Sequence, residues 1–144
     1  MEQVLALLAA FNKGSLDVPS GLLTAKTTYT LNGRSYESIL GGSPDDPLIR
    51  LLSRGAAGYR NAAKALHYAL QEPRATIVSS DPPQAAGDGV VVMLLLLQGR
   101  LRGVQEPFDG TCTLRLRFSG DHLAAVEAVC AEEDLVRIAQ ARTF

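Results

Sequence analysis

Residues 90–130, VVVMLLLLQGRLRGVQEPFDGTCTLRLRFSGDHLAAVEAVC, decide the fold because they carry strand-like patterns in three consecutive segments. Between Phe108 and Phe118 apolar and polar side chains alternate, which predicts a strand with one apolar and one polar face. Val90–Val104 and His122–Cys130 are expected to be the flanking strands, with a tight turn at Ser119–Asp121. The stretch therefore predicts three antiparallel strands.

One face of this sheet is expected to be almost wholly apolar. If the turn at Gln105–Pro107 is tight, Leu101 lies near Gly110 and Leu95 lies near Leu116. The middle strand places five side chains on the apolar face: Phe108, Cys112, Leu114, Leu116 and Phe118. Such a face must be covered, and a long helix further upstream is the expected cover.

The opposite face combines aliphatic side chains with arginines. Its expected members are Val90, Val92, Leu94, Leu96, Arg100, Arg102, Arg115 and Arg117. An aliphatic patch fringed by arginine favours a subunit interface. The alternative is a twisted sheet whose edges fold over the patch.

The N-terminal part is expected to hold helices and one hairpin. Glu2–Asn12 is predicted to be an amphipathic helix that ends near Gly14. Pro19–Ala25 is predicted to be a short helical turn. Asn32-Gly33 between β-favouring residues predicts a hairpin within Thr27–Tyr36, because both turn positions need positive φ.

Asp46-Pro47 is typical of a helix start, since the aspartate side chain caps the helix and proline suits its first turn. The helical pattern continues from Leu48 to Leu70. Gly55 and Gly58 interrupt it, so the sequence leaves open one kinked helix or two. The remaining segments are expected to be a strand, a loop and a helix: Ala75–Ser80, Asp81–Gly89 and Glu132–Ala141.

Composition predicts one globular domain over residues 1–144, with 47% hydrophobic residues and a net charge of −1. The near-zero charge argues against nucleic-acid or anionic-membrane binding. The longest apolar run, Val90–Leu97, is far shorter than the ~20 residues that span a bilayer. The acidic start, which lacks the pattern of a secretory leader, favours a cytoplasmic protein.

Metal and cofactor motifs are not evident in the sequence. His67 and His122 have no partner at metal-ligand spacing, so no metal is expected. Nucleotide-binding loops and serine-hydrolase or zinc-protease motifs are missing, so no cofactor is expected. Cys112 and Cys130 do not make a disulfide framework, and Cys112 is expected to be a small buried hydrophobic residue.

The order of these elements resembles the nuclear transport factor 2-like (NTF2-like) superfamily, which includes ketosteroid isomerase-like and polyketide cyclase-like proteins. The resemblance rests on two N-terminal helices, the hairpin TTYTLNGRSYE, the long helix DPLIRLLSRGAAGYRNAAKALHYAL and the closing strands of residues 90–130. It implies an α+β cone in which a curved antiparallel sheet wraps around the long helix. It also implies a cavity between helix and sheet, and a homodimer formed through the outer sheet face.

A small apolar molecule is the ligand expected for such a cavity. The expected wall is Tyr29, Met93, Leu95, Leu97, Leu114, Leu116 and Phe118. Tyr29 and Tyr36 flank the hairpin, where they either line the mouth of the cone or pack as cross-strand partners.

Glu127 is the first candidate for acid–base chemistry. With a two-residue turn at Gly120-Asp121, Leu123 and Glu127 join the apolar face, where burial would raise the pKa of the carboxyl toward that of a general base. With a three-residue turn every side chain of the strand faces the other way, and Glu127 is a solvated or paired charge. The resemblance favours Leu123 inside, and hence the first register.

Tyr59 and His67 are the other two catalytic candidates. They lie eight residues apart on the long helix, where a tyrosine hydroxyl can donate to a developing oxyanion and a histidine can move a proton. The alternatives are a packed tyrosine ring and an exposed histidine.

Three functions are therefore compatible with the sequence. The first is a binding domain for a small apolar molecule, favoured by the scarcity of polar groups expected inside the cone. The second is an isomerase, dehydratase or cyclase that uses Glu127 with Tyr59 or His67. The third is a protein-interaction module that uses the outer sheet face.

Overall fold

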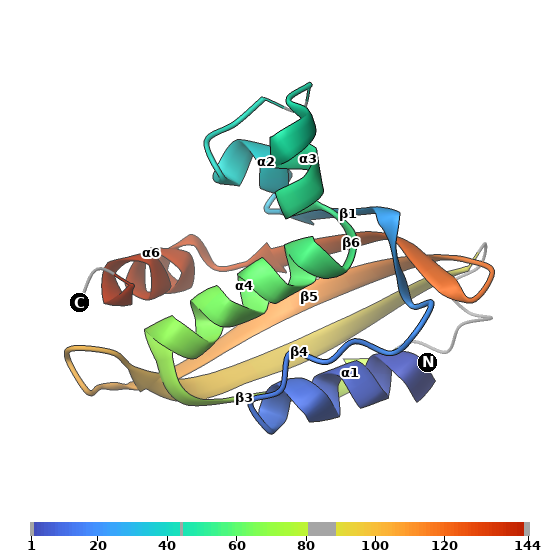
Figure 1. Cartoon of the computed structure of the whole chain (residues 1–144). Helices are drawn as coiled ribbons and strands as arrows, with labels where there is room; N and C mark the ends of the chain where they lie inside the picture. Colours follow the sequence, from blue (N-terminus) through green and yellow to red (C-terminus); the bar gives the residue numbers. More distant parts are fainter. Residues whose placement is uncertain (1, 44, 81–88, 143–144) are drawn as a thin grey trace.

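The computed structural model describes residues 2–43, 45–80 and 89–142. Its elements (Figure 1) are α1 (Glu2–Asn12), β1 (Leu23–Leu31), β2 (Arg34–Ser35), α2 (Tyr36–Ile39), α3 (Pro47–Ser53), α4 (Gly55–Ala69), β3 (Leu70–Ser80), β4 (Val90–Leu101), β5 (Pro107–Ser119), β6 (His122–Cys130) and α6 (Glu132–Ala141). Of the loop expected at Asp81–Gly89, residues 81–88 lie outside the described residues.

The strands form one six-stranded sheet in the order β2-β1-β6-β5-β4-β3. β1 and β6 run parallel, and the other neighbouring strands run antiparallel. Helices α4 and α1 cover the same face of the curved sheet, while α2 and α3 project beyond the start of α4 (Figure 1). The expected α+β class, with a long helix against a curved sheet, is confirmed.

Several local signals give the expected structure. Asn32 and Gly33 have φ values of 51° and 80°, as the turn of the β1–β2 hairpin requires. The side chain of Asp46 accepts a hydrogen bond from the backbone N–H of Leu48, and Pro47 occupies the first turn of α3.

The short helical turn expected at Pro19–Ala25 is wrong. The chain turns at residues 20–22 and enters β1 at Leu23. Buried Thr27 ties this segment to the sheet, because its hydroxyl donates to the Leu123 carbonyl at 2.6 Å. The long-range bond to β6 therefore outweighs the local helix-start signal of Pro19-Ser20.

The long helical pattern divides into two helices, α3 and α4. The helical path of α3 ends at Arg54, whose backbone is extended, and Gly55 then adopts φ +62°, a conformation that glycine tolerates, where α4 begins. A Cβ atom at this position would lie 2.6 Å from the Thr24 carbonyl oxygen, so α4 starts in close contact with β1. The helix ends at Ala69, before the expected Leu70, which already belongs to β3.

The pairing of β4 with β5 differs in register from the expectation. Leu97, not Leu101, lies opposite Gly110, and Val91, not Leu95, lies opposite Leu116. The difference arises because β4 stops at Leu101 and the turn takes residues 102–106, where the Leu101 N–H donates to the Glu106 carbonyl. The shift is an even number of residues, so the side chains within β4 keep their expected faces.

The core lies between the sheet and the helices α1 and α4. One cluster centres on Phe11, Ala63, Leu70, Leu97, Leu101 and Phe108, and a second on Leu22, Val91, Met93, Leu116 and Leu123. At the open edge of β3, the Asn12 side chain accepts from the Ala75 N–H at 2.7 Å and donates to the Ala75 carbonyl at 2.9 Å. Asn12 thus attaches α1 to an edge that would otherwise present unpaired backbone groups.

Candidate functional site

The most informative polar groups of the interior lie on α4. The hydroxyl oxygen of Tyr59 and Nε2 of His67 are both buried, and neither has a hydrogen-bond partner among the described residues. Burial raises the pKa of the Tyr59 hydroxyl, so Tyr59 is a neutral phenol. The His67 ring packs against Phe11 of α1, with ring centroids 4.6 Å apart. The Cα atoms of Tyr59 and His67 are separated by about 12 Å along the helix axis, since eight residues of helix lie between these positions.

Tyr29 and Tyr36 extend this polar region toward the start of α4. The Tyr29 hydroxyl donates to the Gly55 carbonyl at 2.7 Å, and its ring meets that of Tyr36 edge-on at 6.4 Å. Burial raises the pKa of Tyr29, and the neighbouring Tyr59 and Tyr36 raise it further. Tyr29 is therefore a fixed hydrogen-bond donor. Its ring packs against that of Tyr36, but Tyr36 begins α2, so the two are not the cross-strand partners of the expected alternative.

The apolar wall expected for the cavity faces the helices. Met93, Leu97 and Leu116 are buried, whereas Leu95, Leu114 and Phe118 are partly buried and pack against the two core clusters. Two surface hollows among the described residues lie elsewhere. One, of about 370 Å³, lies between α6 and the β4–β5 turn around Leu101 and Arg137, and the other, of about 410 Å³, is lined by Lys64, Tyr68 and Arg142. Neither includes a residue of the expected wall.

The inward orientation expected for Glu127 is wrong. The two-residue turn is present, since Ser119 lies opposite His122, and Leu123 is buried as expected. The register then shifts by one residue between Arg117 and Phe118, so Arg117 faces Ala125 and Arg115 faces Glu127. This β-bulge turns the remainder of β6 over. Glu127 consequently lies on the outer face, 42% exposed and 3.8 Å from the Arg117 guanidinium.

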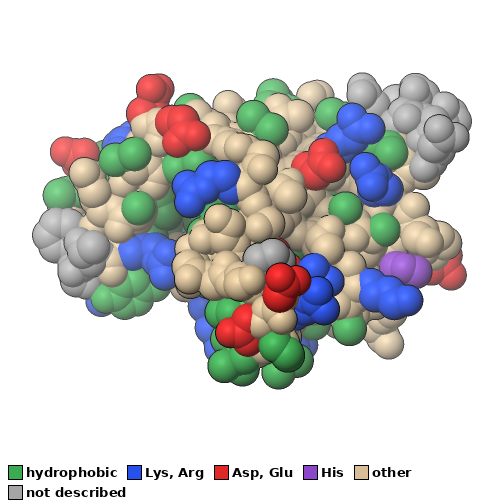
Figure 2. Space-filling view, turned by 90° about the horizontal axis from the view of Figure 1, so that it is seen from above, with side chains coloured by type: hydrophobic (Ala, Val, Ile, Leu, Met, Phe, Trp, Pro, Cys, Tyr) green, Lys and Arg blue, Asp and Glu red, His purple; other side chains and the backbone are tan. Residues whose placement is uncertain are grey.

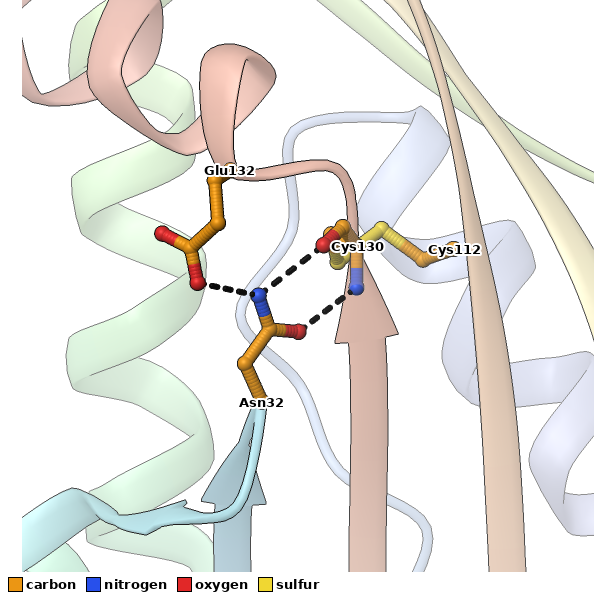
Figure 3. The surroundings of a disulfide bond; sticks show 4 residues. All are labelled: Asn32, Cys112, Cys130 and Glu132. Carbon is orange, nitrogen blue, oxygen red and sulfur yellow. Dashed lines mark hydrogen bonds between the residues drawn. A yellow bond between two sulfur atoms is a disulfide. The ribbon is translucent and has the colours of Figure 1, made fainter.

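The same bulge brings the two cysteines together. It places Cys130 opposite Cys112 instead of one residue out of step, and the two form a disulfide (Figure 3). The expectation of a free buried thiol at Cys112 is therefore wrong. A sequence signal existed, because the hairpin spacing puts the cysteines within one residue of the same register, but the bulge that completes the match has no signature in the sequence.

A buried ion pair also escaped the sequence analysis. Glu37 of α2 is 4% exposed, and its carboxylate accepts from Nε of Arg54 at 2.8 Å. Burial raises the pKa of Glu37, but hydrogen bonds from Arg54, from its own backbone and from Ser53, together with the Arg54 charge, bring it below its ordinary value. The pair fixes α2 against the junction of α3 and α4, which is a structural role.

The outer sheet face is only partly as expected. Val92, Leu94 and Leu96 are half-buried and Arg115 and Arg117 are exposed on it. Val90, however, is buried. Arg102 belongs to the β4–β5 turn, where its guanidinium stacks 4.1 Å from the ring centre of Tyr68.

Figure 2 shows hydrophobic side chains on the projecting α2–α3 region. The exposed ones of this region are Ile39, Leu40, Leu48, Leu51 and Leu52.

No group of three metal-ligating side chains occurs within residues 2–43, 45–80 and 89–142. Over the same residues, no helix has the length and apolar character needed to cross a bilayer.

Solved structures with a similar fold are numerous. A ketosteroid isomerase-like protein from Catenulispora acidiphila, crystallised with trimethylamine, is 19% identical with a TM-score of 0.64, over 88% of this chain and 83% of that one. A candidate SnoaL-like polyketide cyclase from Jannaschia sp. CCS1 is 13% identical with a TM-score of 0.67, over 99% and 90% of the two chains. An NTF2-like protein of unknown function from Exiguobacterium sp. 255-15 is 12% identical with a TM-score of 0.61, over 90% and 98%.

No protein-family model and no curated protein matches the sequence. The similar solved structures nevertheless show that the chain has the NTF2-like fold, which it shares with ketosteroid isomerase-like and SnoaL-like proteins. Because one fold carries many functions, its activity must be argued from the residues inside it.

Proposed function

We propose that the protein binds a small, mostly apolar molecule between α4 and the sheet, with Tyr59 and His67 as its polar anchors. The observation that carries this proposal is the pair of buried, unpartnered polar atoms on α4. Leaving such an atom without a partner costs roughly 1–3 kcal/mol, so native proteins rarely keep two without a use. A ligand with a hydroxyl or carbonyl group would remove this cost when it binds.

The surroundings of these atoms support an apolar ligand. The side chains that pack around Tyr59 come from the cluster of Phe11, Ala63 and Leu97. The Catenulispora acidiphila protein, which has a similar fold, is in complex with the small molecule trimethylamine, and this supports the proposal of a small ligand. Entry of a ligand here requires the side chains between α4 and β4 to repack, since the two surface hollows lie outside this region.

The experiment compares 2-naphthol with naphthalene, which share an apolar body but differ by one hydroxyl. We expect the wild-type protein to bind 2-naphthol roughly tenfold more tightly than naphthalene. One hydrogen bond to a buried group contributes about 1.4 kcal/mol to the binding free energy, which corresponds to a factor of ten. Because 2-naphthol has one hydroxyl, this preference should shrink in Tyr59→Phe, in His67→Phe, or in both if the hydroxyl bridges the two anchors, while naphthalene binding stays. Fluorescence titration measures both affinities.

Tyr68→Phe is the matched control for that titration. Tyr68 lies on the same helix, one residue from His67, but it is 43% exposed and stacked against Arg102. It should keep the wild-type preference. Equal affinity of the wild-type protein for the two compounds, or no binding of either, would contradict the proposal.

A second candidate function is acid–base catalysis on the bound molecule, as an isomerase, dehydratase or cyclase. Its specific support is the unpartnered Nε2 of His67, a candidate general base, with the Tyr59 hydroxyl as donor to an oxyanion. Glu127 has no part in this version, because its carboxylate points to the outer face.

This second candidate is tested with 2-tetralone, an apolar ketone whose α-protons exchange with solvent. If it is correct, the wild-type protein accelerates α-deuteration in D2O, and His67→Phe loses on the order of 100-fold of that acceleration. Glu127→Gln should keep the full rate. If the wild-type protein gives no acceleration over buffer in proton NMR, binding alone remains.

We further propose that the chain forms a homodimer through its outer sheet face. Leu94 pairs with Thr113, which pairs with Val129, so these three form one row across that face. Val129 is 59% exposed, which is unusual for a central strand unless another surface covers it. If the protein is instead a monomer, the same face favours a different protein partner.

A further inference from the structure

The disulfide lies at a junction of three elements rather than in the middle of the sheet. Cys112 and Cys130 form the last residue pair of the β5–β6 ladder, and Cys130 is the final residue of β6. Their Cα atoms are 4.5 Å apart, the spacing of a residue pair that shares no backbone hydrogen bonds. The side-chain link therefore joins the two strands at a pair where the backbone supplies no bond.

Asn32 connects this end of β6 to the β1–β2 turn and to α6 (Figure 3). Its Oδ1 accepts from the Cys130 N–H at 2.8 Å, and its Nδ2 donates to the Cys130 carbonyl at 2.9 Å. The same Nδ2 donates to the carboxylate of Glu132, the first residue of α6, also at 2.9 Å. The hydrogen bonds of Asn32 to Cys130 and Glu132, called the clamp below, thus hold the first turn, or base, of α6 next to the disulfide.

Beyond this end, α6 is held mainly by Ile138 and Ala141, which pack in the core, and by Arg137, which pairs with Glu106 and donates to the Pro107 carbonyl. Among its residues only Ala141 is buried, and its N-cap residue Ala131 makes no side-chain capping bond. The helix contacts α4 and β4, where it forms one wall of the hollow around Leu101 and Arg137. With a single fully buried residue, α6 is expected to have a low local stability, so the clamp at its first turn contributes to holding it in place.

We propose that Cys112 and Cys130 are a reversible redox-modification site that controls how firmly α6 is docked. The reductant is a dithiol. One of its thiolates attacks a sulfur of the pair, breaks the Sγ–Sγ bond and forms a mixed disulfide, and its second thiol then displaces the bound cysteine. The protein gains two electrons and two protons as two thiols, and the dithiol leaves as a disulfide. Exchange with a low-molecular-weight disulfide runs the same steps in reverse.

Two features make the site reversible. Both cysteines are only partly buried and form the last residue pair of the β5–β6 ladder, a position that favours attack by an external thiol. The ladder between β5 and β6 also continues from this pair to Ser119, so the strands stay paired when the disulfide opens. Reduction therefore releases the base of α6 without unfolding the sheet.

The experiment measures amide hydrogen exchange of the full chain with and without dithiothreitol. We expect the oxidised protein to be reduced under native conditions and re-oxidised by glutathione disulfide, as followed by mass spectrometry after thiol alkylation. On reduction, the amides of Glu132–Ala141 should exchange roughly tenfold faster, while those of β4 keep their rates. The double variant Cys112→Ser/Cys130→Ser should show the fast α6 exchange without reductant.

The matched control changes the neighbouring pair on the opposite face, Thr113→Ser/Val129→Ala. It should keep the slow α6 exchange and the full response to dithiothreitol. If the serine variant does not fold, Cys112→Ala/Cys130→Ala replaces it, and the wild-type response alone still decides. The proposal is overturned if reduction requires denaturant, if glutathione disulfide does not restore the bond, or if α6 exchanges equally fast in both states.

Permanent disulfides are characteristic of oxidising compartments, and reversible ones of reducing compartments. The cytoplasmic location expected from the sequence stays a prediction. Ready reduction and re-oxidation of the disulfide would agree with a reducing compartment. The redox proposal is independent of the proposed ligand, because none of its measurements requires one.

Discussion

Tyr59 and His67 are the residues on which the proposed function depends. Both belong to a helix whose buried face is otherwise formed by small and apolar side chains such as Ala63 and Leu66. A polar atom in such a place lowers stability unless something pairs with it. Binding sites commonly keep residues that lower the stability of the free protein because those residues are needed to bind the ligand.

This trade-off gives a prediction for Tyr59→Phe. Removing an unpaired buried hydroxyl should leave the free energy of unfolding unchanged or raise it by about 1 kcal/mol, measured by urea denaturation without ligand. Tyr29→Phe is the control. It should lower the free energy of unfolding by about 1 kcal/mol, because that hydroxyl donates to the Gly55 carbonyl. If Tyr59→Phe is destabilising by as much as Tyr29→Phe, the hydroxyl has a partner.

Glu37 gives a prediction about pH. Its pKa is lowered in the folded protein from the ordinary value of 4.5, so its contribution to stability is fully present above that value. The contribution is lost as the pH falls through the folded pKa. Between about pH 6 and about pH 3, the thermal unfolding midpoint should therefore fall further for the wild-type protein than for Glu37→Gln. Equal falls, measured by circular dichroism, would contradict the assigned role of the pair with Arg54.

The elements of the fold were largely predictable, and their exact pairing was not. The hairpin turn at Asn32-Gly33 and the cap at Asp46 depend on local backbone chemistry, which a sequence states directly. The position of Glu127 depends on one extra residue in β6, which no local preference marks. The same is true of the disulfide, because a shift of one residue decides whether Cys130 meets Cys112.

At the scale of elements, the break between α3 and α4 sets where α4 crosses the sheet. Gly55 permits this break by its positive φ and by its close approach to β1. The start of α4 is also held by the Tyr29 hydroxyl through the Gly55 carbonyl. The placement of Tyr59 and His67 over the sheet therefore depends on a single glycine.

Gly55→Ala should accordingly destabilise the protein by roughly 1–3 kcal/mol, because the new Cβ meets the Thr24 carbonyl in addition to the backbone strain. Gly14→Ala is the matched control. Gly14 has φ +77° with nothing within 4 Å of the added atom, so only the strain remains and the loss should be about 1 kcal/mol. Chemical denaturation compares the two. Equal losses would show that the approach to Thr24 is not tight.

At the scale of the whole molecule, the helices leave the outer face of the sheet uncovered. A stable dimer needs roughly 800 Å² of buried surface on each partner, and the exposed side chain of Val129 on this face is one candidate contribution. The α2–α3 projection also exposes apolar side chains, so within the described chain it is a second candidate for a dimer interface (Figure 2). The two regions are far apart in sequence and can be tested separately.

Leu94→Lys places a charge in the middle row of the outer face, so it should convert the proposed dimer to a monomer. Leu51→Lys is the control on α3, where Leu51 is 68% exposed, and it should leave the dimer intact. Sedimentation of both variants and the wild-type protein measures the outcome. A dimer that survives Leu94→Lys but not Leu51→Lys would move the interface to the α2–α3 projection.

The central claim, that Tyr59 and His67 hold an apolar ligand, is tested most directly by the side-chain nitrogen NMR spectrum of the two histidines. The chain contains only His67 and His122, so the second serves as an internal reference. With saturating 2-naphthol, the Nε2 resonance of His67 should move while those of His122 stay in place. A His67 resonance that does not move, or an equal change at both histidines, would contradict the account.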